Sequence, residues 1–201
     1  MAFAAPVQLG TGVASWTVSG PISGPAQLLS TLPGPYIPNH TTAPQGFWVG
    51  PTTTAGSDAP DGTYTYTLNI GALLAASNPG FSNGSFSLNY ASDDRVQWSI
   101  SGGSLTSATN CTGVSGNGDC YSAGGGAPRP LTGLLTSLGA ILTAVVVNDA
   151  RTPHDPAYAN PTGLLAYGTA DVAAVPLPAS ALLLVSGIMG MMLLSRRKAL
   201  I

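Results

Sequence analysis

GTYTYTLNI, residues 62–70, is the clearest strand signal in the chain. Apolar and aromatic side chains alternate here with polar ones, so that one face carries Tyr64, Tyr66, Leu68 and Ile70 and the other Thr65, Thr67 and Asn69. Because successive side chains of a β-strand point to opposite faces, this period of two predicts a strand with one side in a core. The preceding residues 58–62, DAPDG, predict a turn.

Further strands are predicted on both sides of this stretch. Residues 86–90 and 96–100 repeat the alternation of apolar and polar side chains. Residues 12–19 predict a first strand, and residues 140–148, with three consecutive valines, predict a fully buried one. Residues 163–175 alternate less strictly and predict the last strand before the C-terminal tail.

The remaining segments fit between these strands. Residues 131–138 are compatible with a short helix or a strand, and Gly133 and Gly139 favour the strand. Residues 20–45 predict a long loop draped over a sheet, because helix is excluded by prolines at 21, 25, 33, 35, 38 and 44. Short strands separated by turns predict an all-β fold, and the long crossing loops favour a β-sandwich of the jelly-roll type.

The charge of the chain excludes one class of partner. Charged residues are 7% of the sequence, against about 25% in an average soluble domain. Before the tail, three arginines (Arg95, Arg129 and Arg151) face eight aspartates, which gives a net charge of 3 − 8 = −5. Three separated arginines cannot form a basic patch, so nucleic acid is not an expected partner.

No arrangement of residues predicts an enzyme. A Gly-x-Ser-x-Gly motif is absent, and the two histidines, His40 and His154, lie in Pro-containing loop sequences. Asp93 and Asp94 are adjacent, so on a strand their carboxylates would point to opposite faces. We therefore expect no enzymatic activity.

The C-terminal tail, VPLPASALLLVSGIMGMMLLSRRK (175–198), has three parts: a Pro-containing pentapeptide, an apolar run and a basic cluster. Residues 179–195 are uncharged and, as a helix, would span roughly 26 Å, enough for a thin bilayer. Arg196, Arg197 and Lys198 predict a cytoplasmic end for residues 196–201, with everything before Val175 outside. A hydrophobic helix packed in a soluble core is the alternative.

Val175-Pro176-Leu177-Pro178-Ala179, followed by the apolar run and the basic end, resembles the VPLPA variant of the PEP-CTERM sorting domain. The resemblance implies a Gram-negative bacterium that makes exopolysaccharide. It also implies recognition by an exosortase, a membrane enzyme thought to cleave near the motif. The protein would be anchored in the inner membrane before processing and would then reach the cell surface or the extracellular matrix. The two prolines favour an extended, accessible segment beside the membrane.

A second resemblance covers roughly residues 10–174. The order of GTYTYTLNI (62–70), GSFSLNYASDDRVQWSISGG (84–103), LTAVVVNDA (142–150) and NPTGLLAYGTADV (160–172) is similar to bacterial extracellular proteins that carry PEP-CTERM tails. This similarity implies a galactose-binding-like jelly roll, a fold shared by many carbohydrate-binding modules. The chain departs from the pattern at Ser101-Gly102-Gly103, where relatives carry a Leu-Asn-Gly turn.

These observations predict a single ectodomain, residues 7–174, in front of the sorting motif. Ala2-Phe3-Ala4 has the small-x-small form of a signal-peptidase site, so residues 1–6 are interpreted as the remnant of a cleavage region or as the mature N-terminus. We expect a longer reading frame to encode an apolar segment upstream.

Cys111 and Cys120 lie in a Gly-rich stretch and predict a local disulfide in an oxidising compartment. The closed loop of about ten residues would contribute about 2–3 kcal/mol on the chain-entropy model. A zinc site is the alternative, but two cysteines at this spacing without a nearby histidine are a poor match to zinc geometry.

No cofactor is required by this reading, and a structural calcium ion is an open alternative. Jelly rolls of the resembled type often hold calcium through aspartates and loop carbonyls, and calcium takes six to eight oxygen ligands. The candidate ligands are Asp58, Asp61, Asp93 and Asp94. The competing interpretation is that these aspartates form turns by hydrogen bonding to their own backbone.

Carbohydrate binding usually needs an exposed aromatic side chain that stacks on a sugar. Trp16 and Trp98 are predicted to lie in the core, so the candidate surface platform is Trp48, followed by Tyr36 and Tyr158. Two functions remain: a non-enzymatic exported surface or matrix protein linked to exopolysaccharide and biofilm, or a lectin-like adhesion module that binds carbohydrate, with or without calcium.

Overall fold

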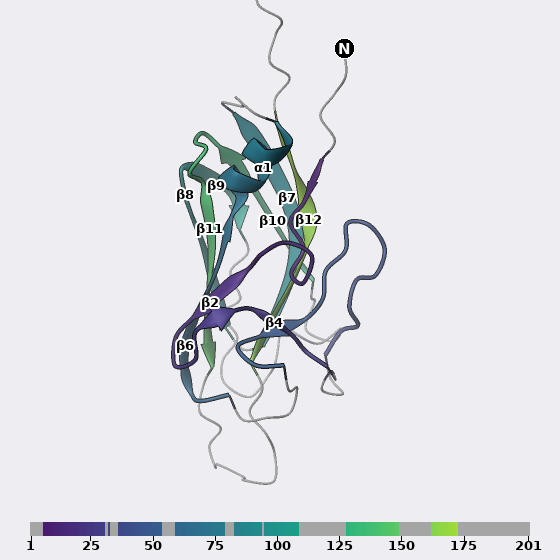
Figure 1. Ribbon diagram of the computed structural model, residues 1–201, viewed down its shortest axis with the longest axis vertical. Helices are drawn as coiled ribbons and strands as arrows, with labels where there is room; N and C mark the ends of the chain where they lie inside the picture. Colours follow the sequence, from purple (N-terminus) through teal and green to yellow (C-terminus); the bar gives the residue numbers. More distant parts are fainter. Residues whose placement is uncertain are drawn as a thin grey trace, which may run out of the picture.

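The computed structural model consists of two antiparallel β-sheets that pack face to face (Figure 1). The structure describes residues 6–30, 32, 36–53, 59–78, 83–93, 95–108, 128–148 and 162–172. The expected all-β sandwich is confirmed at this level. The predicted sorting tail, residues 175–201, lies outside the described residues, as do Cys111 and Cys120.

The first sheet has seven strands. Its strands follow the order β4-β5-β12-β7-β10-β9, with β1 also paired to β12. The bounds are β1 (Val7–Gln8), β4 (Gln27–Leu28), β5 (Val49–Gly50), β7 (Gly84–Asp93), β9 (Gly103–Ala108), β10 (Arg129–Leu135) and β12 (Gly163–Val172). The long pair of β7 and β12 forms its centre, because all ten residues of β12 are in register with β7.

The second sheet has five strands in the order β3-β2-β6-β11-β8. The bounds are β2 (Thr17–Ser19), β3 (Gly24–Pro25), β6 (Gly62–Asn69), β8 (Arg95–Ser101) and β11 (Ile141–Asn148). β11 is central and pairs with β6 on one side and β8 on the other.

The core lies between the two sheets and is rich in aromatic side chains. Tyr64 and Tyr66 of β6 are fully buried, as the alternation in GTYTYTLNI predicts. Trp98 of β8 packs edge-to-face on two rings, with centroid distances of 6.3 Å to Trp16 and 5.0 Å to Tyr90. Burial of each such side chain stabilises the fold by about 1.5–3 kcal/mol, and edge-to-face contacts add to this.

One short helix, α1 (Ile70–Ser77), follows β6 at one end of the sandwich (Figure 1). The Asn69 side-chain oxygen accepts a hydrogen bond from the Ala72 amide at 2.8 Å and so caps the helix. The Gly71 amide donates to the Ala140 carbonyl at 3.0 Å, and a Cβ at Gly71 would lie only 2.0 Å from the Leu138 carbonyl oxygen. This helix was not predicted, and Ile70 therefore opens α1 instead of closing the strand.

Two other strand predictions differ in detail, and a third is confirmed for most of its length. Of residues 12–19, only Thr17–Ser19 form a strand, because a turn comes first: the amides of Val13 and Ala14 donate to the Gly10 carbonyl, and Gly12 is left-handed with φ of 75°. Residues 141–148 alternate between buried and partly exposed, so this strand is not buried on both sides. Residues 131–135 form a strand and not a helix, which is the alternative that Gly133 and Gly139 favoured.

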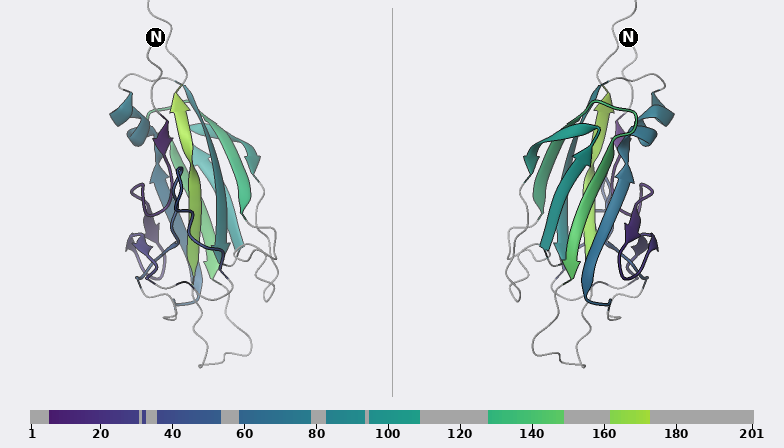
Figure 2. Two further views of the ribbon diagram at one scale, coloured as in Figure 1. Left: turned by 90° about the vertical axis from the view of Figure 1, so that its right-hand side faces the viewer. Right: turned by 90° about the vertical axis from the view of Figure 1, so that its left-hand side faces the viewer.

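The described chain enters and leaves the sandwich at one end. Val7 of β1 pairs with Ala170 of β12, so both lie at the same end of the seven-stranded sheet (Figure 2). Within the described ranges, no helix combines the length and apolar character that a membrane span requires.

Candidate functional site

The Pro-containing segment, predicted as one long loop, also contains the short strands β3 and β4, and its described residues from Leu29 to Ile37 lie over the outer face of the seven-stranded sheet. Its side chains form a second apolar cluster, separate from the main core, on the outward side of β7 and β12. This outer cluster contains the buried residues Tyr36, Trp48, Ala91 and Leu165, with Leu29, Leu32, Ile37 and Tyr167 packed against them.

Trp48 is at the centre of the outer cluster and is only 1% exposed. Its indole N–H donates to the Ile37 carbonyl at 2.8 Å, and its amide donates to the Asn39 side-chain oxygen at 2.7 Å. The expectation that Trp48 forms a surface platform is therefore wrong. The segment that precedes Trp48 folds back over the ring and satisfies its polar atom, as a buried indole requires.

Tyr36 packs on Trp48 with a ring-centroid distance of 4.4 Å and is 7% exposed, so it is not a surface platform either. Its hydroxyl donates to the Asp93 carboxylate. Asp93, the last residue of β7, is itself only 7% exposed, and its carbonyl accepts from the Thr162 hydroxyl at 3.4 Å. A buried carboxylate needs hydrogen-bond donors, so this contact fastens the segment to the sheet.

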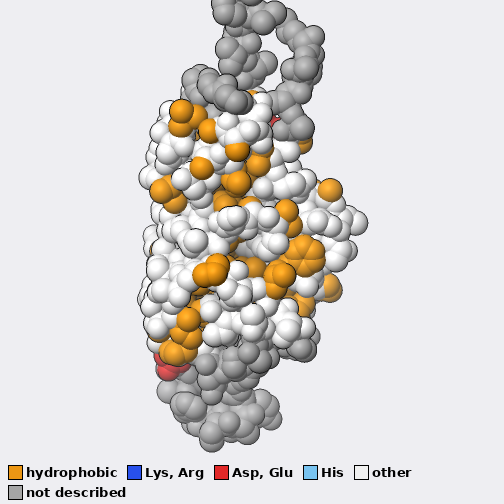
Figure 3. Space-filling model, viewed as in Figure 1, with side chains coloured by type: hydrophobic (Ala, Val, Ile, Leu, Met, Phe, Trp, Pro, Cys, Tyr) orange, Lys and Arg blue, Asp and Glu red, His pale blue; other side chains and the backbone are white. Residues whose placement is uncertain are grey.

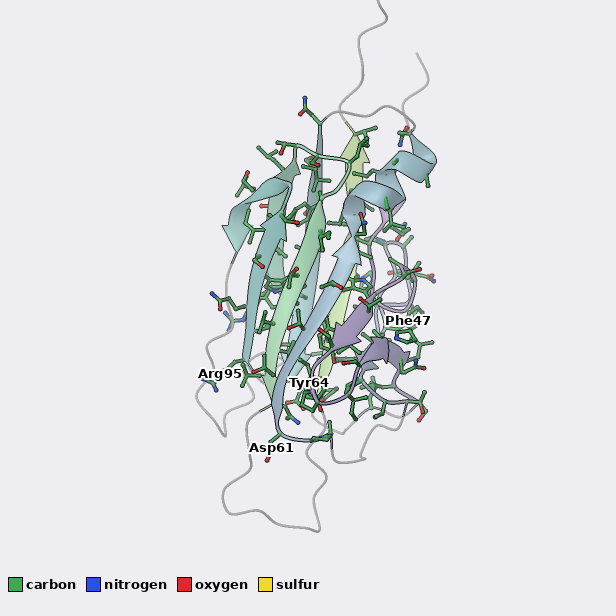
Figure 4. All side chains as sticks on the ribbon, turned by 60° about the vertical axis from the view of Figure 1, so that its left-hand side comes forward. Phe47, Asp61, Tyr64 and Arg95 are labelled. Carbon is green, nitrogen blue, oxygen red and sulfur yellow. The ribbon has the colours of Figure 1, made fainter. Side chains whose placement is uncertain are left out.

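The aspartates proposed for calcium are only partly described. Asp61 is exposed at the start of β6 (Figure 4), whereas Asp93 is buried under Tyr36. Asp58 and Asp94 lie outside the described residues. Among all the described residues, no three His, Cys, Asp or Glu side chains lie close enough together to hold a metal ion. Tyr158, the remaining aromatic candidate, is also outside the described part of the chain.

Asp61 acts instead on the neighbouring tyrosine. Burial raises the pKa of Tyr64, and the negative charge of Asp61 raises it further. The Tyr64 hydroxyl donates to the Pro60 carbonyl at 2.9 Å, which fixes the turn before β6. The Asn148 amide also donates to the Ala59 carbonyl, at 3.0 Å. These contacts hold the carbonyls of Ala59 and Pro60 in place before β6, and neither of them is made by an aspartate side chain.

Two core tyrosines have strongly perturbed acidity. Burial raises the pKa of Tyr66 far above its usual value, with smaller contributions from Tyr64 and Asp93. The Tyr66 hydroxyl is buried without a hydrogen-bond partner in the described structure. Burial also raises the pKa of Tyr90 to about 12, although the positive charge of Arg129 acts in the opposite direction. These groups lie in the core and have no access to a substrate.

The outward side of the five-stranded sheet carries a different surface, which we call the threonine face. Its residues are Thr17, Ser19, Thr63, Thr65, Thr67, Gln97, Ser99, Thr143, Val145 and Val147. The strand registers place Thr17, Thr67, Thr143 and Ser99 in one row across four strands, and Ser19, Thr65, Val145 and Gln97 in the next. The Thr17 and Thr67 hydroxyls are hydrogen-bonded at 2.7 Å.

The threonine face is open and almost without charge. Each of its side chains is exposed or partly exposed, and no described strand packs on it (Figure 2, right). Two charged residues of opposite sign border its lower end: Arg95, in register with Val147, and Asp61, directly before β6 (Figure 4). The side of the molecule seen in Figure 3 shows acidic side chains only near its two ends. The sequence predicts the outward direction of Thr65 and Thr67 but not the rows that they form with other strands.

Comparison of the chain with protein-family models, with curated proteins and with solved structures finds no match.

Proposed function

We propose that this chain is a non-enzymatic exported protein of the bacterial surface or extracellular matrix, sorted by an exosortase. The single observation that carries the proposal is the tail, in which Val175–Ala179, the apolar run 179–195 and Arg196-Arg197-Lys198 follow one another in the order of a VPLPA sorting domain. In this proposal residues 179–195 cross the inner membrane and residues 196–201 remain in the cytoplasm.

The fold is compatible with this arrangement. β12 ends at Val172, so two residues separate the described sandwich from the motif. A proline-containing segment beside a folded domain is extended and exposes its backbone to a processing enzyme. The low charge of the chain suits a protein that works in a hydrated, uncharged polymer matrix.

We further propose that the ectodomain is a jelly roll. Strands β1-β12-β7-β10 lie side by side in one sheet and β6-β11-β8 in the other. Successive long strands therefore alternate between the sheets from β6 to β8 and again from β10 to β12, which is typical of jelly rolls. The departure is β9, which pairs with β10 of the first sheet.

Processing of the tail tests the proposal. The chain would be produced in a bacterium with an exosortase, with one epitope tag before residue 175 and another after residue 201. We expect the mature surface fraction to keep the first tag and to lose the second. Pro176→Ala with Pro178→Ala should leave the full-length chain, with both tags, in the inner membrane, because the extended motif is lost.

Pro38→Ala is the matched control, since Pro38 is exposed in a loop far from the motif in sequence. It should be processed and exported like the unaltered protein. Equal processing of the motif variant, or unchanged processing in a strain without exosortase, would contradict the proposal.

The lectin-like alternative is favoured by one observation, the open and uncharged threonine face. The aromatic candidates that are described do not favour it, because Trp48 and Tyr36 are buried.

A further inference from the structure

We propose that the threonine face binds a neutral polysaccharide. The inference rests on the proposed function, because a matrix protein meets such polymers after export. It adds a contact surface and a ligand class, an uncharged and extended glycan chain.

The hydroxyl groups of the face are spaced regularly in two directions. Neighbouring strands are about 4.8 Å apart, and side chains on one side of a strand repeat every 6.7 Å or so. Thr63, Thr65 and Thr67 follow one another along β6, while Thr67 and Thr143 are neighbours across β6 and β11. Each hydroxyl offers one donor and two acceptor sites, and sugar hydroxyls offer the same. Two surfaces of this kind can exchange hydrogen bonds without any charged group.

The face is also held rigidly before a ligand arrives. Threonine and valine are branched at Cβ, which restricts the first side-chain torsion. The bond between the Thr17 and Thr67 hydroxyls joins β2 to β6, and β11 is paired on both sides. A rigid surface loses little conformational entropy on binding, so weak individual hydrogen bonds can add up to a measurable affinity.

Apolar groups lie between the hydroxyls. Val145 and Val147 are partly exposed on β11, and every threonine adds a methyl group. Pyranose rings present C–H groups on their faces and hydroxyls at their edges. The mixture of methyl and hydroxyl groups on the face therefore matches both parts of a sugar.

The charge of the face selects the class of polymer. Acidic polysaccharides and nucleic acids need basic partners, and Arg95 at the border supplies a single positive charge. Protein partners are usually anchored by Trp, Tyr or Arg in a central pocket, and the face carries none of these at its centre. A neutral glycan needs neither a basic surface nor a central pocket for an anchoring side chain.

The position of the face agrees with tethering at the C-terminal end. The chain leaves the sandwich at the end where β1 pairs with β12, whereas the threonine face lies along the side (Figure 2). A polymer could therefore run along β6 and β11 while the tail holds the protein.

Binding of the full-length protein in mild detergent to cellulose, curdlan and chitin tests the inference, with alginate as the acidic polymer. The variant Thr65→Val, Thr67→Val, Thr143→Val removes three hydroxyls while it keeps side-chain shape and strand propensity. We expect the unaltered protein to bind at least one neutral polymer, equally at low and high salt. The triple variant should bind about tenfold more weakly or worse, because it loses three hydrogen-bonding groups.

The matched control is Thr106→Val with Thr132→Val. These two hydroxyls form a similar bond, at 3.0 Å, between β9 and β10 of the other sheet. The control should bind like the unaltered protein, and circular dichroism should show that both variants are folded.

Three results would overturn the inference. One is no binding to any neutral polymer, and the second is equal binding by the folded triple variant. The third is a concentration-dependent dimer that the triple variant cannot form, which would assign the face to contact between copies of the chain. Processing of the tail is measured separately, so normal sorting without glycan binding would reject this inference and leave the proposed function intact.

Discussion

The hydroxyl of Tyr36 connects the Pro-containing segment to the end of β7 through the buried carboxylate of Asp93. Tyr36→Phe removes this donor and leaves the ring in contact with Trp48. We expect the free energy of unfolding to fall by about 1–3 kcal/mol, because a buried carboxylate loses one of its hydrogen bonds. Urea unfolding would measure the loss. Tyr167→Phe, in the same outer cluster, is the control, and an equal effect of both substitutions would contradict the role given to Tyr36.

Tyr66 is the opposite case, since its hydroxyl is buried without a partner in the described structure. Tyr66→Phe keeps the ring in the core and removes the unsatisfied polar atom. We expect the unfolding free energy at neutral pH to rise by about 1 kcal/mol, because the desolvation cost of the hydroxyl disappears. A clear loss of stability in urea unfolding would show that this hydroxyl has a partner.

The acidity of the core tyrosines predicts how stability depends on pH. A tyrosine in the unfolded chain ionises near pH 10, whereas burial raises the pKa of Tyr90 to about 12 and that of Tyr66 further. Between these values the unfolded state binds fewer protons than the folded state, so stability falls as pH rises. The loss is about 1.4 kcal/mol per pH unit for each such tyrosine.

Urea unfolding at a series of pH values from neutral to alkaline would show this decline beginning near the ordinary tyrosine pKa. Tyr66→Phe should decline less steeply, by the contribution of one tyrosine. A stability that stays flat through this range would contradict the burial of the two hydroxyls.

Strand β10 needs a glycine at position 133. It is paired with Phe86 of β7, and a Cβ there would lie 2.4 Å from the Phe86 ring and 2.7 Å from the Ser104 carbonyl oxygen. We expect Gly133→Ala to destabilise the fold by about 1–3 kcal/mol, because neither the ring nor the backbone can move freely.

Gly139→Ala is the control for this prediction, since a Cβ there meets only the Ser137 hydroxyl oxygen, at 3.6 Å. Its unfolding midpoint should change little. Similar midpoints for both variants would mean that Phe86 can leave Gly133 without cost.

The strands with strict alternation could be predicted from sequence because the pattern itself records burial. Residues 62–69 and 86–90 are extended, with the expected side chains in the core. The short strands β3, β4 and β5 have only two residues each and leave no period to detect. For α1 a local signal existed, since Asn69 is a good helix cap and the next residues are mostly Ala and Leu. The strong alternation of β6 masked it.

The site was less accessible to prediction, because it depends on which segments meet. An isolated tryptophan after a Pro-containing loop is compatible with exposure, and only the folded segment shows that Ile37 and Asn39 cover Trp48. The rows of the threonine face require the registers of four strands, and sequence alone fixes the direction of side chains but not their neighbours.

We expect the whole described sandwich to fold without the C-terminal tail but not without its last strand, β12. β12 lies between β5 and β7, all ten of its residues are in register with β7, and its side chains Leu164, Leu165, Ala166 and Ala170 are buried. A chain that ends at residue 174 keeps every described strand. We expect it to be soluble without detergent, to give the circular dichroism of a β protein, and to unfold in one cooperative transition.

A chain that ends at residue 162 is the matched comparison, because it loses β12 as well as the tail. The outer cluster around Trp48 then loses Leu165 and Tyr167, and β7 loses the partner on one of its two sides along its full length while it stays paired with β10. This shorter chain should lack a cooperative transition and should aggregate, since β7 becomes a long open edge that exposes both backbone hydrogen-bonding groups and apolar surface. If the chain that ends at residue 174 were also unfolded, the tail would have to contribute to the stability of the sandwich. The placement of the sorting motif after an independent domain would then be wrong.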